Sequence, residues 1–345
     1  MSIMRNNWKL DEINSLYEKP FNSLLSLAHD IHIKNHEENT VQVCTLLSVK
    51  TGGCPEDCGY CSQSVHSDNP IESTPLLSLE EVREKAKIAK EQGSTRFCMG
   101  AAWRRPSNKN IDRVIEMIKV VHELDMESCV TLGMLSEDQA LRLANSGLNY
   151  YNHNLDTSRE HYSKVISTRN YQDRLNTLKY VRKSGINVCS GGILGLGETR
   201  EDRIKLLIEL ANLEKHPESV PINMLVKMEG TRLSNNKEID ELEFIRTIAI
   251  ARIMMPKTYV RLSAGRESMS DSMQALCFYA GANSVFYGEE LLTAPNVDIQ
   301  KDKDLFINLG MKIEGNENFL KNKNNFKKKI KTNKKDTTYN LKLIN

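Results

Sequence analysis

Three cysteines lie within eight residues of the stretch TGGCPEDCGYCSQS, with the residue type and spacing of a metal-binding loop. They are Cys54, Cys58 and Cys61. A structural zinc site normally has four protein ligands, and a disulfide framework uses cysteines in pairs. A group of three therefore indicates a centre that keeps one coordination position for another molecule.

Three further cysteines fall near the middle of separate segments that read as strands. They are Cys98 in TRFCMGA, Cys129 in SCVTLG and Cys189 in INVCSGGI. Alternate residues of a barrel strand point inward, so these thiols could converge inside a barrel. Free cysteine is also a common buried residue, and by the same test Cys44 and Cys277 are interpreted as core residues.

Polar residues on the predicted strands indicate that the same interior binds a ligand. Arg261, in YVRLSAGRES, falls mid-strand, where a buried guanidinium is costly unless it is paired or serves a site. Asn152, Asn154 and Asp156 alternate along YNHNLDTS, and Asn223 lies on another strand. Amides both donate and accept hydrogen bonds, which suits a polar, uncharged ligand with a urea or amide group. The alternative is that these are satisfied core amides or turn residues.

Eight short segments rich in β-branched residues alternate with amphipathic helical patterns such as LSLEEVREKAKIAKEQG. The segments are 41–49, 95–101, 128–133, 149–155, 186–193, 220–226, 259–264 and 283–288. Several helical patterns begin with a Ser, Thr or Asp cap. This order predicts an α/β fold, a (β/α)₈ TIM barrel over residues 41–312, preceded by a helical extension at 1–40. A doubly wound sheet is the alternative.

The net charge of +2 is unevenly distributed along the chain. Residues 316–345 hold nine lysines against two acids, about +7, so the rest of the chain is near −5. This argues against nucleic-acid binding by the body, and residues 313–345 are predicted to form a disordered Lys/Asn-rich tail. The sequence has neither an apolar signal segment nor a run of roughly 18 apolar residues. With eight cysteines and no secretory signal, we expect a cytoplasmic protein without a membrane partner.

The motif CPEDCGYC, in the loop after the first predicted strand, resembles that of the radical S-adenosylmethionine (SAM) enzymes. Further stretches resemble the biotin synthase family within that group, in order and spacing, from about residue 10 to 312. They are RFCMGAAWR, YYNHNLDTS, GGILGLGE, NMLVK, RLSAGRE, QALCFYAGANSVFYGE and LLTAPN. GGILGLGE lacks the G-x-G-x-x-G spacing of a dinucleotide site, so that reading is rejected.

The resemblance implies two iron–sulfur clusters as cofactors, with SAM as a third. The implied ligands are Cys54, Cys58 and Cys61 for a [4Fe–4S] cluster with an iron open to SAM, and Cys98, Cys129, Cys189 and Arg261 for a [2Fe–2S] cluster. Arginine has a pKa above 12, and only a deprotonated nitrogen binds iron. Such a ligand makes sense where the cluster must be labile and give up sulfur.

The resemblance also implies a substrate and its contacts. Tyr60, Asn154, Asp156 and Ile193 would bind SAM, and Asn152, Asn154 and Asn223 would bind the substrate. The implied reaction is the last step of biotin synthesis, from dethiobiotin to biotin. A 5′-deoxyadenosyl radical formed from SAM removes hydrogen from an unactivated carbon, and the second cluster provides the sulfur. A flavodoxin- or ferredoxin-type electron donor and a homodimer are implied as partners.

Other functions remain open at the level of sequence. Lipoyl synthase also inserts sulfur, but it carries an extra cysteine cluster before its radical motif, whereas only Cys44 precedes Cys54 here. Other barrel radical enzymes would keep the first three cysteines without the strand cysteines and Arg261. A zinc-binding structural module is the alternative from a different class. Zinc without iron or inorganic sulfide would favour that module.

Overall fold

The computed structural model of the chain describes residues 4–288, 290–316 and 319–320. Its centre is a closed barrel of parallel strands, in which β1 pairs with both β2 and β9. The strands are β1 Thr40–Lys50, β2 Arg96–Ala101, β3 Glu127–Thr131, β4 Tyr150–Asn152, β5 Asn187–Cys189, β6 Gly192–Leu194, β7 Ser219–Met224, β8 Tyr259–Leu262 and β9 Ser284–Phe286. The predicted TIM barrel is confirmed, and the doubly wound alternative is wrong because such a sheet does not close.

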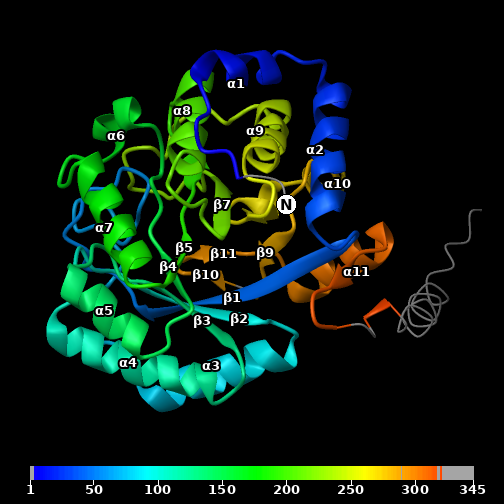
Figure 1. Ribbon diagram of the computed structural model, residues 1–345. Helices are drawn as coiled ribbons and strands as arrows, with labels where there is room; N and C mark the ends of the chain where they lie inside the picture. Colours follow the sequence, from blue (N-terminus) through cyan, green and yellow to red (C-terminus); the bar gives the residue numbers. More distant parts are fainter. Residues whose placement is uncertain (1–3, 289, 317–318, 321–345) are drawn as a thin grey trace, which may run out of the picture.

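Helices surround the barrel (Figure 1), and most of them contribute buried apolar side chains to the core. They are α3 Leu79–Glu91, α4 Asn108–His122, α5 Glu137–Asn145, α6 Arg159–Val165, α7 Tyr171–Lys183, α8 Arg200–Ala211, α9 Glu241–Met254, α10 Asp271–Tyr279 and α11 Ile299–Leu309, with a short 3₁₀ helix η1 at Arg266–Ser268. The predicted caps form: the hydroxyl of Ser78 accepts from Glu81 N at the start of α3, and Asp240 caps α9 in the same way. Such caps satisfy backbone N–H groups that have no partner within the helix.

The N-terminal extension forms two helices, α1 (Leu10–Tyr17) and α2 (Phe21–Asn35), which lie over α8 and α9 at the top of Figure 1. At the other end of the chain, β12 (Lys312–Ile313) pairs with the start of β1. Ile313 is buried. The predicted disorder of the tail falls largely on residues 317–318 and 321–345, outside the described residues.

The fifth predicted strand divides into β5 and β6 at Ser190 and Gly191, and Gly192 begins β6. A Cβ at Gly191 would lie 1.9 Å from the carbonyl oxygen of Pro221, a distance that no side chain tolerates. The glycines thus let this segment approach β7 closely. Gly191 O accepts from Asp156 N at 3.2 Å, and Asp156 O accepts from Ile193 N at 2.8 Å. These hydrogen bonds therefore fix the positions of Asp156 and Ile193, two of the predicted SAM contacts, relative to each other.

The strand register places the predicted thiols on the inner face of the barrel. Leu46 pairs with Cys98, and Cys98 pairs with Cys129. Paired residues of adjacent strands share a face, as do residues two apart on one strand, so Cys44 faces inward with them. These side chains form a small cluster separate from the main core, together with Tyr150 and Phe286 among others.

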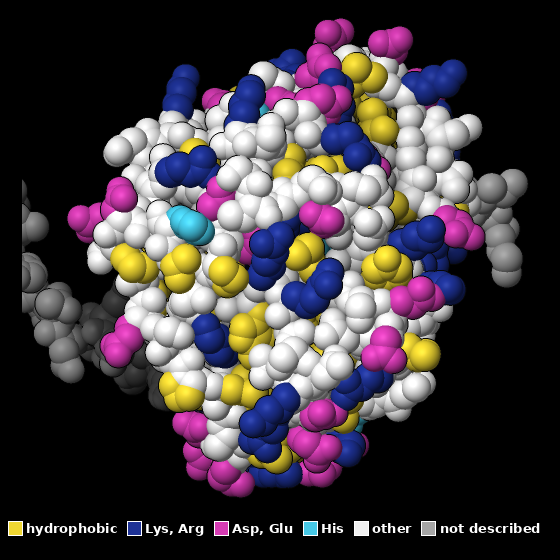
Figure 2. Space-filling model, turned by 90° about the vertical axis from the view of Figure 1, so that its left-hand side faces the viewer, with side chains coloured by type: hydrophobic (Ala, Val, Ile, Leu, Met, Phe, Trp, Pro, Cys, Tyr) yellow, Lys and Arg dark blue, Asp and Glu magenta, His cyan; other side chains and the backbone are white. Residues whose placement is uncertain are grey.

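One face of the molecule, seen in Figure 2, carries acidic and basic side chains interspersed with apolar ones. Such mixing does not create the single-sign field expected of a nucleic-acid surface. Within the described residues, no helix combines the length and apolar character needed to cross a membrane.

A buried ion pair joins α11 to the loop after β8, and breaking it should destabilise the fold. Arg266 and Asp302 are both fully buried and hydrogen-bonded, with Arg266 Nη1 3.2 Å from Asp302 Oδ2. Asp302→Asn should lower the free energy of unfolding by about 3–5 kcal/mol, because it leaves a buried guanidinium without its counter-charge. Urea unfolding of the reduced apoprotein measures this effect.

The matched control is Glu116→Gln, the same acid-to-amide change in an exposed pair with Lys119. Exposed pairs are screened by water, so no measurable change is expected there. Equal stability of Asp302→Asn and the parent would show that the buried pair does not hold α11 in place.

Candidate active site

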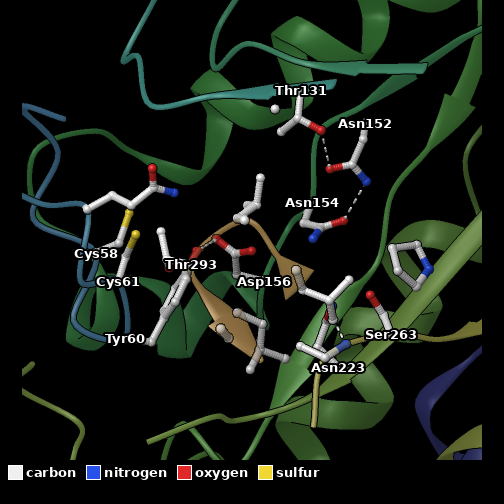
Figure 3. A pocket seen from close by; sticks show the side chains of 18 of the residues that line it. Cys58, Tyr60, Cys61, Thr131, Asn152, Asn154, Asp156, Asn223, Ser263 and Thr293 are labelled. Atoms are coloured by element: carbon white, nitrogen blue, oxygen red, sulfur yellow. Dashed lines mark hydrogen bonds between the residues drawn. The ribbon is translucent and has the colours of Figure 1, made fainter. Parts of the chain in front are cut away.

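The loop after β1 brings Cys54, Cys58 and Cys61 to one end of the barrel interior. Backbone hydrogen bonds fold the loop on itself: Cys61 N donates to Cys58 O at 3.0 Å, and Cys54 N donates to Gln63 O at 2.9 Å. All three are free cysteines, and all three line the same cavity. Figure 3 shows Cys58 and Cys61 side by side, with Tyr60 between them and the centre of the cavity.

Contacts to the connection between α6 and α7 hold this loop in place. The carboxylate of Asp57 accepts from the backbone N–H groups of Ser167 at 2.9 Å and Thr168 at 3.2 Å. Burial alone would raise the pKa of Asp57, but hydrogen bonds from the hydroxyl and backbone N–H groups of Ser167 and Thr168 lower it to about 2. Arg232 Nη2 donates to the carbonyl groups of Asp57 and Val165 at 3.0 and 2.7 Å. The thiols are therefore positioned before any ligand binds.

The electrostatic surroundings keep these thiols protonated while no metal is bound. Burial raises the pKa of Cys58 to about 12 and that of Cys61 to about 11, and it also raises the pKa of Cys54. Arg169 opposes this at Cys58, where its Nη2 lies 3.7 Å from Sγ. Because thiolates are the metal ligands, metal binding here would release protons.

Asp156 lies at the centre of the cavity and is held by two neighbours. Its Oδ2 accepts from Tyr60 OH at 2.9 Å and from the guanidinium of Arg174, with which it forms a buried ion pair. Its backbone is in the left-handed region, with φ of 68°. That conformation is uncommon for a non-glycine residue, although Asp adopts it more readily than most. Ile193 lines the same cavity.

The predicted amides form a polar wall deeper in the barrel (Figure 3). Asn152 Oδ1 accepts from Thr131 Oγ1 at 3.2 Å, and its Nδ2 donates to Asn154 Oδ1 at 3.2 Å and lies 3.3 Å from Cys189 Sγ. Asn223 is held by the backbone, with Nδ2 2.9 Å from the carbonyl of Gly192. These bonds fix the side-chain orientations of the three amides, all of which line the cavity.

The strand cysteines and Arg261 meet at the far end of the cavity. The thiol of Cys129 hydrogen-bonds to the sulfur of Cys98, which lowers the pKa of Cys98 to about 7 and raises that of Cys129. Arg261 is fully buried. Burial lowers the pKa of its guanidinium, but the thiols of Cys44, Cys189 and Cys98 raise it, and the net shift of the pKa is upward. A guanidinium thus lies among three thiols.

One cavity of about 330 Å³ connects the two groups of cysteines. It is lined by the predicted residues Cys54, Cys58, Tyr60, Cys61, Cys98, Cys129, Asn152, Asn154, Asp156, Ile193, Asn223 and Arg261. The remaining predicted ligand, Cys189, contacts the side chain of Asn152 through its sulfur, and Asn152 in turn lines the cavity. A hairpin of β10 (Glu290–Leu291) and β11 (Ala294–Pro295) covers part of the cavity, and Leu292 packs so close to Gly100 that a Cβ there would lie 2.5 Å away.

Several residues of the site were not predicted from the sequence. Arg169 and Arg174 come from α7 and the loop before it, where a charged residue is indistinguishable from others on an amphipathic helix. His153 is buried against the cavity, and burial lowers its pKa well below the usual value, so its imidazole is neutral. Cys277 lies in the main core as expected, whereas Cys44 lies beside Cys98. The sequence signal that could have placed Cys44 there is its position on the inward face of the first strand.

The sequence matches two family models that together span the barrel. Residues 48–210 match the radical SAM superfamily, and residues 221–312 match the biotin and thiamin synthesis associated domain. Biotin synthase from Thioalkalivibrio sulfidiphilus is 60% identical over 311 residues, which are 90% of this chain and 92% of that protein. The chain belongs to the biotin synthase family. Biotin synthase from Acinetobacter baumannii is 59% identical over 311 residues, 90% of this chain and 94% of that protein.

Solved structures agree on the fold. The FeFe-hydrogenase maturase HydG from Carboxydothermus hydrogenoformans superposes with a TM-score of 0.78 at 20% identity, covering 89% of this chain and 76% of that one. Methylornithine synthase superposes with a TM-score of 0.76 at 21% identity, covering 90% of this chain and 95% of that one. Membership of the biotin synthase family makes this chain a radical SAM enzyme that inserts sulfur in biotin synthesis.

Proposed function

We propose that this chain converts dethiobiotin to biotin between two iron–sulfur clusters held at opposite ends of the barrel cavity. The proposed ligands are Cys54, Cys58 and Cys61 for a [4Fe–4S] cluster with one position open to SAM, and Cys98, Cys129, Cys189 and Arg261 for a [2Fe–2S] cluster. The observation that carries the proposal is the single cavity that both groups of cysteines adjoin. A substrate bound between them would face both.

The loop cysteines fit the first cluster by the chemistry of their donor set. Three thiols converge on one end of the cavity. Arg169 contacts the Cys58 sulfur and would balance the negative charge of Cys58 in its thiolate form. Among the described residues, no group of three or more His, Cys, Asp or Glu side chains is arranged around a single metal ion. A [4Fe–4S] cluster does not require one, because each of its three thiolates binds a different iron.

The strand residues fit the second cluster through two polar atoms as well as the thiols. Within the described part of the chain, buried Arg96 Nη1 and Ser219 Oγ have no hydrogen-bond partner. Arg96 pairs in register with Cys44, and Ser219 with Cys189, so both side chains share the face of the thiols. Buried donors without partners are rare in proteins. Bridging sulfides between the thiols would provide acceptors for both.

The clusters, when bound, would supply the electron that cleaves SAM and the sulfur that enters the product. The chain's own residues position the reactants. Tyr60 would border the nucleoside, held there by its hydrogen bond to Asp156. The Oδ1 of Asp156 would accept from the ribose hydroxyls, and Ile193 would contact the adenine. Asn154 would donate to the ribose hydroxyls through Nδ2, because its Oδ1 already accepts from Asn152 and Gly191. The closed barrel and the hairpin that covers part of the cavity would limit the access of water to the reactive carbon.

The amide wall suits the cyclic urea of dethiobiotin. Asn152, Asn154 and Asn223 present both donors and acceptors, whereas the urea offers one carbonyl and two N–H groups. Charged side chains would bind a neutral urea less selectively. The family resemblance further supports a flavodoxin- or ferredoxin-type electron donor, suited to a low-potential cluster, and a homodimer.

Anaerobic reconstitution tests the proposal. The full-length chain is incubated with iron, sulfide and a reductant, then with SAM, dethiobiotin and a flavodoxin- or ferredoxin-type donor, and biotin is quantified. We expect biotin, 5′-deoxyadenosine and bound iron with inorganic sulfide. Zinc without sulfide, and no biotin, would favour the structural module instead.

Asp156→Asn tests the proposed ribose contact. Loss of a charged acceptor weakens a hydrogen bond by about 1.5–3 kcal/mol, so SAM affinity should fall on the order of 10–100-fold. Equilibrium SAM binding to the reconstituted protein measures the change. Asp202→Asn is the matched control: Asp202 accepts from Ser158 at 2.6 Å at the start of α8, away from the cavity lining. An unchanged affinity in Asp156→Asn would place the ribose elsewhere.

A further inference from the structure

Cys44 is a fourth thiol packed beside the strand cysteines, next to the cavity lining formed by Cys98 and Cys129. It lies near the middle of β1, fully buried, and packs with Cys98 and Cys129 rather than with the main core. The thiol is not isolated: its Sγ lies 3.4 Å from Gln42 Oε1 and 3.2 Å from Arg261 Nη2. The second contact places the Cys44 sulfur directly beside a nitrogen of Arg261, the side chain proposed as an iron ligand.

Arg261 cannot easily move away from this thiol. Its Nε donates to Ser284 Oγ at 3.0 Å, and its guanidinium stacks over the ring of Phe286 at 4.7 Å. Ser284 in turn donates to Gln42 at 3.1 Å. These neighbours come from β1 and β9, the two strands whose pairing closes the barrel. The closure therefore holds the Arg261 nitrogen and the Cys44 sulfur together.

A thiol hydrogen-bonded to a glutamine could be purely structural, as in an ordinary core. Two observations indicate that this thiol can also bind iron. First, Cys44 shares its packing cluster with two of the proposed cluster ligands. Second, an iron bonded to Arg261 Nη2 would lie next to Sγ, because that sulfur is only 3.2 Å from the same nitrogen. Thiolate is also a far better iron ligand than guanidine, whose pKa lies above 12.

We propose that Cys44 is an alternative fourth ligand of the second cluster, able to take the iron position that Arg261 otherwise holds. This inference rests on the proposed function. In the exchange, the Cys44 S–H bond breaks and a sulfur–iron bond forms, while the nitrogen–iron bond of Arg261 breaks and the guanidine takes up the thiol proton. No electron is transferred. The resulting guanidinium remains a donor to the new thiolate, which is a strong charge-assisted pair.

The consequence is a choice between two modes of holding the cluster. Three thiolates and a guanidine hold it weakly and favour the release of sulfur. Four thiolates hold it more tightly, which favours retention of the cluster between turnovers. Cys44 would thus protect the second cluster in the resting enzyme.

The test measures iron and inorganic sulfide per chain, together with visible absorbance, in the full chain carrying Cys58→Ala so that the first cluster does not form. Into this background are placed Arg261→Met, Cys44→Ser and both together, each reconstituted anaerobically. Each single variant should keep the second cluster, because the other residue fills the fourth position. The double variant should lose iron to a chelator at least about tenfold faster, since loss of even indirect support weakens metal sites by about that factor.

Cys277→Ser in the same background controls for polar substitution of a buried cysteine, and circular dichroism checks folding. Loss of the cluster from Arg261→Met as complete as from the double variant would overturn the role of Cys44. Equal retention by the double variant and its parent would overturn it as well. An absence of iron and sulfide from the Cys58→Ala parent would contradict the second cluster itself, and with it the proposed function.

Discussion

Replacing Cys58 with Ala is expected to abolish the formation of 5′-deoxyadenosine from SAM. Cys58 is the most deeply buried of the three loop cysteines, and its sulfur faces the cavity beside Arg169. With two thiolates remaining, a cluster could not hold its open iron toward SAM. Loss of outer-shell contacts alone reduces metal-site activity by about 10–100-fold, so loss of a ligand should exceed that. Chromatographic quantification of 5′-deoxyadenosine under anaerobic reducing conditions measures it.

Cys277→Ala is the matched control for this variant. It makes the same substitution at a fully buried cysteine in the main core, away from the cavity lining. Any loss of stability from removing a buried sulfur should be similar, but SAM cleavage should remain. Undiminished SAM cleavage by Cys58→Ala would rule out the radical reaction at this loop.

Replacing Cys189 with Ala is expected to remove biotin formation while sparing part of the SAM cleavage. Cys189 belongs to β5 and contacts Asn152, whereas the loop cysteines are held by separate hydrogen bonds to residues 165–168. The first cluster should therefore remain whole in this variant. Biotin and 5′-deoxyadenosine are measured in the same reaction, so that their ratio reports which cluster is damaged.

The Cys277→Ala variant again serves as the reference, with both products retained. A Cys189→Ala enzyme that makes biotin at the parent rate would show that the second cluster is not held by these strand residues. A loss of both products in equal proportion would instead show that Cys189 supports the first cluster.

The fold and the two groups of cysteines could be predicted because each depends on a short-range pattern. Strand periodicity fixes which side of a strand faces the barrel, so Cys98 and Cys129 could be placed inside without knowing their partners. The spacing of the loop cysteines likewise needs no tertiary information. The break between β5 and β6 was not predicted, because it depends on the close approach of Gly191 to Pro221 on another strand.

The rest depends on contacts between distant segments. Arg174 reaches Asp156 from a helix whose pattern gives no sign of it. Cys44 meets Arg261 only because β1 and β9 close the barrel, and because a long side chain on β8 extends across the strand between them. Sequence periodicity predicts the direction in which each side chain points, but it does not predict which residues of other segments that side chain contacts.

The origin of the sulfur tests the central claim most directly. The chain is reconstituted with isotopically labelled sulfide, freed of unbound sulfide, and given SAM, dethiobiotin and a reducing system containing unlabelled sulfide for one turnover. Mass spectrometry of the biotin then reports its sulfur. If the thiols of the barrel interior hold a cluster that is consumed, the first biotin formed carries the label, and labelled sulfide is lost from the protein in step with it. Unlabelled biotin, formed while the protein keeps all of its labelled sulfide, would contradict this account.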